Sequence, residues 1–288
     1  MPELPEVQTT VSDLNKKIIG RKITGAWFDW RKLIKSPLKE FEKDIKNRKI
    51  LRIKRRAKNI LIYLSDDYIL LVHQKMTGHL LVGKWKIEGK KVIPVEPENV
   101  VSDPQNRFIH LILFLDNGKM LGLSDLRKFA KVILGKRDRI ENLEDLKNLG
   151  PDALAVEYEN FKKIIQRVRG KIKQVLMDQK IIAGIGNIYS DEMLWLAKIH
   201  PFRPANKLSE KEIKALYLAM KNVLEKAIRL RGTSVSDYRD ILGKEGNYGN
   251  VRYVYQKEGE KCPRGNGIIK RIKMGGRSAH FCPVCQKL

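Results

Sequence analysis

The chain has few cysteines and no long apolar segment. Its 288 residues include three cysteines, all beyond residue 261. An odd number at one end argues against a disulfide framework and favours a reducing compartment. The apolar runs, such as residues 111–115 and 181–186, are far too short to span a bilayer, so no membrane attachment is expected. Glu3 and Glu6 interrupt the region that a secretory signal would occupy, so none is expected.

Acidic residues are also in short supply. Asp and Glu number 33 against 58 Lys and Arg, which gives a formal net charge of +25 and a pI near 9.9. Such an excess is typical of a protein that binds a polyanion, either nucleic acid or an anionic membrane surface. The hydrophobic content of 42% suits packed cores, and the length suits two domains. These totals favour a cytoplasmic nucleic-acid-binding protein and leave open whether it is an enzyme.

The first half of the chain is predicted to be mostly β-structure behind one helix. Apolar residues spaced four, three and four apart predict an amphipathic helix over residues 5–19. Period-two patterns predict strands over residues 50–58, 60–64, 68–73, 108–115, 120–123 and 131–134. In the first strand, basic residues through Lys58 share one face, and Leu51 is expected on the opposite, apolar face. With the hairpin signal Asp116-Asn117-Gly118, this pattern favours a β-sandwich or barrel.

After about residue 150 the pattern becomes helical. Apolar stripes with helical spacing occur near residues 161–168, 172–176, 187–196 and 209–227. The last stripe begins with Ser209 and Glu212 at the spacing of a capping box. A glycine-rich stretch, residues 243–250, then leads to the tail. The predicted fold class is α+β multidomain, with an N-terminal helix and β-sandwich followed by a helical domain.

The tail has the spacing of a zinc ribbon with one ligand missing. Cys282 and Cys285 form a complete Cys-x-x-Cys knuckle, whereas Cys262 is followed by Gly265 where a fourth cysteine would stand. The basic residues between the knuckles predict a β-hairpin that faces phosphates. Three interpretations stay open: zinc held by the three cysteines with His280 or solvent as fourth ligand, a hairpin folded without metal, or a weakened site.

The chain opens Met1-Pro2-Glu3-Leu4-Pro5-Glu6-Val7. Removal of Met1 would leave Pro2 at the N-terminus, with a secondary amine that can attack an aldehyde-like carbon and form an iminium. Carboxylates at Glu3 and Glu6 lie within one helical turn and are suited to serve such a nucleophile. The alternative is a plain helix start, because proline fits the first turn and acids favour the positive end of the helix dipole.

Several motifs beyond this opening occur in an order that is specific to one family. They are Arg56-Ala57-Lys58, His73-Gln74-Lys75-Met76-Thr77-Gly78, Asp125-Leu126-Arg127-Lys128-Phe129, Gly184-Ile185-Gly186-Asn187-Ile188-Tyr189 and Glu258-Gly259-Glu260-Lys261-Cys262. With the opening, they resemble the formamidopyrimidine-DNA glycosylases, bifunctional base-excision repair enzymes related to endonuclease VIII. The likeness covers essentially the whole chain, and the opening favours the formamidopyrimidine branch. Leu126, Lys128 and Ala130 depart from the family's usual proline, arginine and glycine.

The resemblance implies a DNA glycosylase with AP lyase activity that flips the damaged nucleotide out of duplex DNA. Pro2, freed of Met1, would attack C1′ and release an oxidised purine, such as 8-oxoguanine or a formamidopyrimidine. The resulting iminium would permit strand cleavage by β- and δ-elimination. Glu3 would be the acid/base residue, and Glu6 would hold the terminal amine. Lys58, counted with the catalytic residues, would contact a phosphate.

The resemblance also implies five DNA contacts. Met76, Arg127 and Phe129 would fill the space left by the flipped nucleotide, with Met and Phe wedged between bases and Arg bonded to the orphaned base. The alternative for Met76 and Phe129 is ordinary core packing. Asn187 at a helix start and Arg277 in the tail would bind phosphates.

The resemblance adds detail to the fold class. The helical region would be a helix–two-turn–helix domain, and the tail a zinc-ribbon-like hairpin with one zinc ion. The predicted segments are a catalytic β-sandwich domain over residues 1–136, a linker over 137–153, the helix–two-turn–helix domain over 154–242, and the lesion loop with the hairpin over 243–288.

The implied partner is double-stranded DNA that contains oxidised bases or abasic sites, bound by a monomeric, nucleoid-associated protein. Three alternatives stay open: a related glycosylase that prefers oxidised pyrimidines, a non-catalytic damaged-DNA-binding protein on the same scaffold, and an RNA-binding protein, which only the charge favours. The presence of Pro2, Glu3 and Glu6 together argues against lost catalysis.

Overall fold

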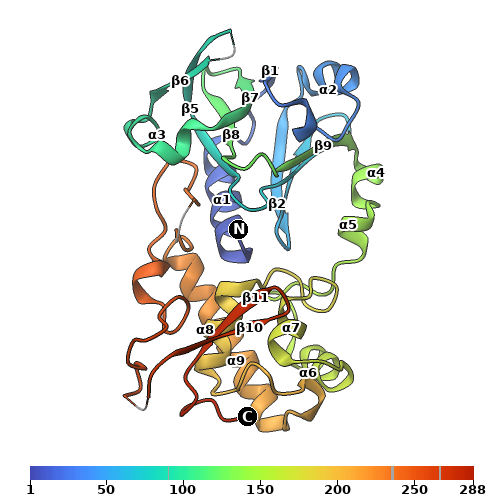
Figure 1. Cartoon of the computed structure of the whole chain (residues 1–288). Helices are drawn as coiled ribbons and strands as arrows, with labels where there is room; N and C mark the ends of the chain where they lie inside the picture. Colours follow the sequence, from blue (N-terminus) through green and yellow to red (C-terminus); the bar gives the residue numbers. More distant parts are fainter. Residues whose placement is uncertain (90, 235–236, 266) are drawn as a thin grey trace. The chain divides into compact units, whose positions relative to one another are not determined.

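The computed structural model describes residues 1–89, 91–234, 237–265 and 267–288 (Figure 1). The chain divides into two compact units, each built from two stretches of sequence. Unit 1 comprises Met1–Lys147 and Leu230–Gly249, and unit 2 comprises Asn148–Arg229 and Asn250–Leu288. The four segments predicted from the sequence have other boundaries than these two units, and that division of the chain stays a prediction.

Unit 1 contains two antiparallel sheets and a long helix, α1 (Leu4–Lys17). One sheet has the strand order β1 (Ile23–Phe28), β7 (Ile109–Leu115), β8 (Met120–Ser124), β5 (His79–Glu88) and β6 (Lys91–Glu96). The other has the order β2 (Ile50–Arg56), β3 (Asn59–Leu64), β4 (Tyr68–His73) and β9 (Lys131–Lys136). Shorter helices connect them: η1 (Arg31–Leu33), α2 (Leu38–Ile45), α3 (Glu98–Ser102), η2 (Pro104–Arg107), α4 (Arg137–Glu141) and α5 (Glu144–Lys147).

The core of unit 1 is formed by apolar side chains from both sheets and from α1. Val7, Val11, Leu14 and Ile18 are at most 4% exposed and join one cluster with residues of both sheets. Full burial of such a side chain contributes about 1.5–3 kcal/mol. Asn15 fastens α1 to β2, since its amide exchanges hydrogen bonds of 2.8 and 3.2 Å with the backbone of Ile53. The predicted helix and sandwich are therefore confirmed.

The first predicted strand departs from simple alternation. A register shift between Ile50 and Arg52 turns Leu51 outward, where it is 52% exposed. The prediction that Leu51 lies on the apolar face was wrong for this reason, because one extra residue moves a side chain to the other face. The strand also ends at Arg56, and Ala57 adopts a φ of +54°. Lys58 consequently lies in a turn and is only 6% exposed.

Three strands, β1, β5 and β6, were not predicted from the sequence. Gly83 interrupts the pattern of β5 beside a second register shift, and Pro94 lies within β6. Glycine and proline weaken the strand signal because they mark bulges and edges. The Asp116-Asn117-Gly118 hairpin was predicted correctly, and Gly118 supplies the φ of +75° that the turn requires.

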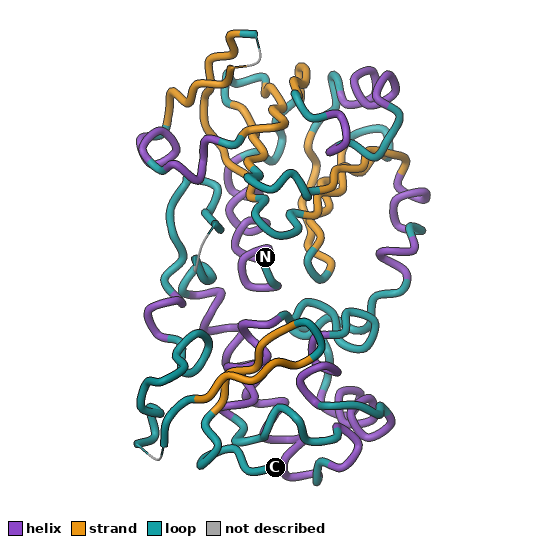
Figure 2. Tube along the Cα trace, in the orientation of Figure 1, coloured by secondary structure: helices purple, strands orange, loops and turns teal. Residues whose placement is uncertain are grey.

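Unit 2 combines helices with a terminal hairpin (Figure 2). Its helices are α6 (Tyr158–Arg167), α7 (Ile172–Met177), α8 (Asn187–Leu196), η3 (Ala205–Lys207) and α9 (Glu210–Arg229). The short η4 (Tyr248–Val251) begins in unit 1 and ends in unit 2. In unit 2, β10 (Lys270–Met274) pairs antiparallel with β11 (Arg277–Phe281). The predicted capping box of α9 is confirmed, since the Ser209 N–H donates to Glu212 and the Glu212 N–H donates back to Ser209. Among the described residues, no helix is long and apolar enough to cross a membrane.

Candidate active site, nucleic-acid contacts and metal centre

The first turn of α1 holds the N-terminal residues in place. Pro2 is buried, and Glu3 and Glu6 are each 2% exposed. The Glu6 carboxylate accepts the Glu3 N–H at 2.7 Å through Oε2 and the Thr233 N–H at 2.8 Å through Oε1. Gly232 packs so closely that an added Cβ would lie 2.7 Å from Oε1 of Glu6. Glu6 therefore fixes the peptide that follows Pro2 by joining it to residues 232–233.

The terminal amine lies in a buried, charged environment. In the unprocessed chain the amine belongs to Met1, and burial lowers its pKa below the usual value, assisted by the positive charge of Lys58. Glu3, Glu6 and Asp237 oppose this shift. A lowered pKa increases the neutral, nucleophilic fraction of an amine near neutral pH. Asp237 was missed in the sequence because no motif surrounds it.

Lys58 shares its surroundings with the loop that follows β4. Burial lowers the pKa of His73 to about 4, and the positive charges of Lys75, Lys58 and Lys131 act in the same direction. Nδ1 of neutral His73 accepts the backbone N–H of Lys75 at 3.0 Å. His73 therefore stays uncharged at neutral pH and shapes the loop that contains Met76.

Asp125 joins the loop that contains Met76 to the loop that contains Phe129. The Thr77 hydroxyl donates to Asp125 Oδ1, and Asp125 Oδ2 accepts the Ala130 N–H at 2.7 Å. The Arg127 N–H donates to the Thr77 hydroxyl oxygen at 3.0 Å. The two bonds to Asp125 are buried and the bond to Arg127 is partly buried, so the two loops are held as one unit. The role of Asp125 could have been found from its place at the start of the Asp-x-Arg motif.

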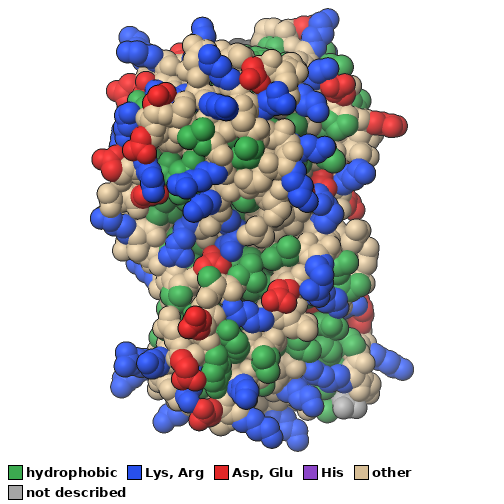
Figure 3. Space-filling view, turned by 180° about the vertical axis from the view of Figure 1, so that it is seen from behind, with side chains coloured by type: hydrophobic (Ala, Val, Ile, Leu, Met, Phe, Trp, Pro, Cys, Tyr) green, Lys and Arg blue, Asp and Glu red, His purple; other side chains and the backbone are tan. Residues whose placement is uncertain are grey.

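The two joined loops present three side chains at the surface. Phe129 is 52% exposed, Arg127 is exposed with its guanidinium 4.7 Å from the centre of the Phe129 ring, and Met76 is half-buried. Phe129 therefore does not take part in core packing. Met76 and Phe129 line a hollow of about 450 Å³ together with Trp30 and several lysines. Figure 3 shows Lys and Arg side chains spread widely over one face of the molecule.

Asn187 begins α8 behind a tightly bonded loop. The side chain of Gln179 accepts the Gly184 N–H at 2.9 Å and donates to the Ile185 carbonyl at 2.8 Å. Gly184 has a φ of +111°, which favours glycine. Oδ1 of Asn187 is buried and has no hydrogen-bond partner among the described residues. An amide NH₂ group and the backbone N–H groups at a helix N-terminus can donate to an anion such as a phosphate, whereas Oδ1 can only accept.

Arg277 is the first residue of β11, and its side chain is exposed. The hairpin of β10 and β11 packs against α8, so Arg277 and Asn187 lie on neighbouring elements of unit 2. Sequence reasoning placed both residues on these elements.

The cysteines of the tail converge as the spacing predicted. The sulfur atoms of Cys262, Cys282 and Cys285 all lie within 4.8 Å of one another. Burial and the two neighbouring thiols raise the pKa of Cys285 to about 11, and a bound cation would favour its thiolate form. An added Cβ at Gly265 would meet nothing within 4 Å, so a side chain can be accommodated at this position. The residues present therefore fit zinc, which would contribute folding energy to the hairpin.

His280 is engaged elsewhere. Its Nδ1 lies 3.0 Å from Asp191 Oδ2, and its Nε2 lies 3.4 Å from Glu258 Oε2. The group of candidate ligands within the described residues contains the three cysteines without His280. The assignment of His280 as fourth ligand stays a prediction, and this geometry gives it no support.

Comparison with known proteins gives a consistent result for the whole chain. Family models match residues 1–132 (formamidopyrimidine-DNA glycosylase N-terminal domain), 149–239 (formamidopyrimidine-DNA glycosylase H2TH domain) and 259–288 (zinc finger found in FPG and IleRS). The chain is 41% identical to a formamidopyrimidine-DNA glycosylase of Pelotomaculum thermopropionicum, with 100% of both chains covered. It is 40% identical to that of Chloroflexus aurantiacus over 99% of this chain and 98% of the relative.

Solved structures agree. A complex of the Lactococcus lactis Fpg with abasic-site DNA matches at a TM-score of 0.86 and 33% identity, covering 99% of this chain and 100% of that one. A complex of the same relative with N7-benzyl-Fapy-dG DNA matches at 0.85 and 34% identity, with 100% of both chains covered. The predicted family, fold class, enzyme class and zinc finger are confirmed. The chain belongs to the formamidopyrimidine-DNA glycosylase family of DNA-repair enzymes.

Proposed function

We propose that the protein removes oxidised purines, 8-oxoguanine and formamidopyrimidines, from duplex DNA and then cleaves the strand at the abasic site. The observation that supports this most is the buried N-terminal arrangement of Pro2, Glu3 and Glu6 in the field of Lys58. A protein that only binds DNA has no need of two buried carboxylates beside an N-terminal proline. In this proposal the protein acts as a monomer at the chromosome.

Catalysis begins with the Pro2 nitrogen once Met1 has been removed. The nitrogen forms a bond to C1′ as the bond from C1′ to the damaged base breaks, and the base leaves with a proton. Glu3 protonates the sugar ring oxygen as the ring opens, which gives the iminium. Glu6 orients the amine through its bond to the Glu3 N–H. The iminium acidifies the sugar hydrogens, so loss of the 3′ and then the 5′ phosphate follows.

The remaining site residues bind the bent and opened DNA. Met76, Arg127 and Phe129 occupy the space of the flipped nucleotide, and the exposure of Phe129 is what such insertion requires. Lys58, Asn187 and Arg277 bind phosphates, so affinity falls steeply with salt.

Borohydride trapping tests this function. The Met1-processed protein, verified by intact mass, is expected to become covalently attached to duplex DNA that carries 8-oxoguanine opposite cytosine. The matched control is the same chain with an N-terminal extension that converts the Pro2 nitrogen into an amide, and it should give no adduct. Absence of an adduct on both this lesion and an abasic site would refute the enzyme hypothesis. Faster processing of an oxidised pyrimidine would favour the alternative substrate class.

A further inference from the structure

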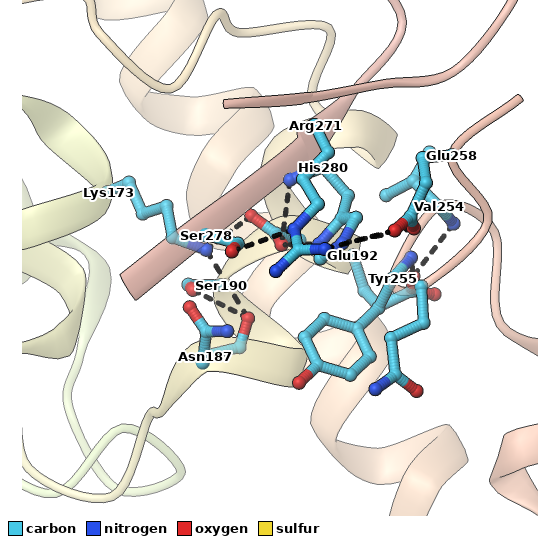
Figure 4. Close-up of polar contacts among 12 residues, drawn as sticks. Lys173, Asn187, Ser190, Glu192, Val254, Tyr255, Glu258, Arg271, Ser278 and His280 are labelled. Carbon is cyan, nitrogen blue, oxygen red and sulfur yellow. Dashed lines mark hydrogen bonds and ion pairs between the residues drawn. The ribbon is translucent and has the colours of Figure 1, made fainter. Parts of the chain in front are cut away.

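Two adjacent acidic residues of α8, Asp191 and Glu192, are almost completely buried in a strongly basic protein. Their exposures are 1% and 0%. Carboxylates are rarely buried unless their charge is compensated by hydrogen bonds or a counter-ion. Figure 4 shows Glu192 and His280 with their polar neighbours at the junction between α8 and the hairpin. The proposed mechanism uses neither residue.

Asp191 connects three elements. Its Oδ1 accepts from Lys173 Nζ of α7 at 2.5 Å, in an ion pair whose side chains are at most 1% exposed. Its Oδ2 accepts both the backbone N–H and the ring Nδ1–H of His280 on β11, each at 3.0 Å. One carboxylate therefore ties α7, α8 and the last strand together.

Glu192 holds the chain on the other side of the hairpin. Its carboxylate accepts the backbone N–H groups of Tyr253, Val254 and Tyr255 at 2.7, 2.9 and 2.9 Å. Three consecutive amides outside any helix or strand are thereby satisfied by one side chain. Both ends of the segment that contains the hairpin are thus anchored to the same turn of α8.

The anchored turn lies close to both proposed phosphate contacts. Asn187 is one helical turn before Asp191, and Lys173 Nζ also lies 3.4 Å from the Asn187 carbonyl oxygen. Arg277 is three residues before His280 on β11, about 10 Å along the strand. None of these bonds involves the cysteine site.

We propose that Asp191 and Glu192 are positioning residues that set Arg277 relative to Asn187, so that the two side chains reach DNA phosphates together. The proposal rests on the proposed function for the phosphate contacts. It also explains how a finger with Gly265 in place of a cysteine keeps its hairpin on α8.

A double-mutant cycle tests it. Asp191→Asn, Arg277→Ala and the double variant are compared with the wild type for affinity to a duplex with a tetrahydrofuran abasic analogue, by fluorescence anisotropy at several salt concentrations. Each single variant is expected to weaken binding on the order of tenfold and to reduce the salt slope by about one. Because Asp191 acts through Arg277, the double variant should be no more than about threefold weaker than either single variant. Fully additive losses would overturn the proposal.

Two further variants distinguish a positioning role from a general loss of folding. Asp191→Asn leaves Lys173 without its charge partner and risks unfolding. His280→Ala keeps that ion pair and should reproduce the change in salt slope with a smaller loss of affinity. Glu212→Gln removes the partly exposed ion pair with Arg203 in the same unit and should change affinity less than twofold. A change of slope in Glu212→Gln, or none in His280→Ala, would contradict the positioning role.

Hydrogen exchange supplies a readout that does not depend on DNA chemistry. Glu192→Gln should increase amide exchange at residues 253–255, and Asp191→Asn at the hairpin, while α9 stays protected. Unchanged exchange at the hairpin in Asp191→Asn would contradict the positioning role. If borohydride gives no adduct while exchange responds as stated, only the proposed function fails.

Discussion

The contact between Gly232 and Glu6 gives a sharp test of how the terminal amine is held. Gly232 has a φ of +80°, and an added Cβ would lie 2.7 Å from Oε1 and 2.8 Å from Cγ of Glu6. Gly232→Ala must therefore displace the Glu6 side chain. Gly20 is a matched control, because it has the same φ of +80° in the same unit and an added Cβ would meet nothing within 4 Å.

The expected losses of unfolding free energy follow from these surroundings. An alanine in the left-handed region costs about 1–2 kcal/mol, and this cost applies equally to Gly20→Ala and Gly232→Ala. Gly232→Ala also disrupts the buried bond from the Thr233 N–H to the Glu6 carboxylate, and a hydrogen bond to a charged group contributes about 1.5–3 kcal/mol. Gly20→Ala should therefore lose about 1–2 kcal/mol and Gly232→Ala about 2.5–5 kcal/mol in denaturant unfolding.

Activity should separate the two variants further. Displacement of Glu6 also releases the Glu3 N–H, so the rate of borohydride trapping under single-turnover conditions should fall at least tenfold in Gly232→Ala. Gly20→Ala should trap at the wild-type rate. Equal stability and equal trapping in the two variants would show that the Glu6 contacts do not hold the amine.

Three other predictions concern the loops and the finger. Because the pKa of His73 is lowered to about 4, the unfolded chain binds a proton between pH 6.5 and 4 that the folded chain does not. The free energy of unfolding should therefore fall by at most about 3.4 kcal/mol as pH falls through this window. His73→Gln should flatten that dependence in denaturant titrations, and an unchanged slope would contradict the shift. Phe129→Ala should leave stability within about 0.5 kcal/mol yet weaken binding to lesion duplex about tenfold in anisotropy, since the ring is exposed. Gly265→Cys should raise zinc affinity at least tenfold in chelator competition and alter the absorption of the cobalt-substituted protein. The φ of +77° at this position should cost the variant about 1–2 kcal/mol of stability. Unchanged zinc affinity would show that the fourth ligand position does not lie at Gly265.

Local patterns in the sequence were sufficient for the long helices and most strands. Close neighbours in the sequence determine the apolar stripe of α1, the capping box of α9 and the Asp116-Asn117-Gly118 turn. The outward rotation of Leu51 was not predictable, because a bulge is decided by pairing with β3 and not by the strand's own pattern.

In the candidate site, too, residues within local motifs could be predicted from the sequence and their distant partners could not. The motifs located Pro2, Glu3 and the three cysteines, since each lies in a short signature. The partners that hold these residues lie far away in sequence: Thr233 for Glu6, and Asp191 for His280. Neither Thr233 nor Asp191 lies in a sequence pattern that predicts its contact, because a buried hydrogen bond between distant segments produces no periodic pattern along the chain.

The bond between Glu6 and Thr233 spans 227 positions of the chain. During synthesis, α1 leaves the ribosome first. The Glu6 carboxylate can bond to Thr233 only after residues 230–249 have emerged and completed unit 1. A nascent or prematurely terminated chain therefore carries the Pro2 amine without the segment that fixes it. In the proposed mechanism, strand cleavage would thus require almost the entire polypeptide, including helix α8 with the proposed phosphate contact Asn187.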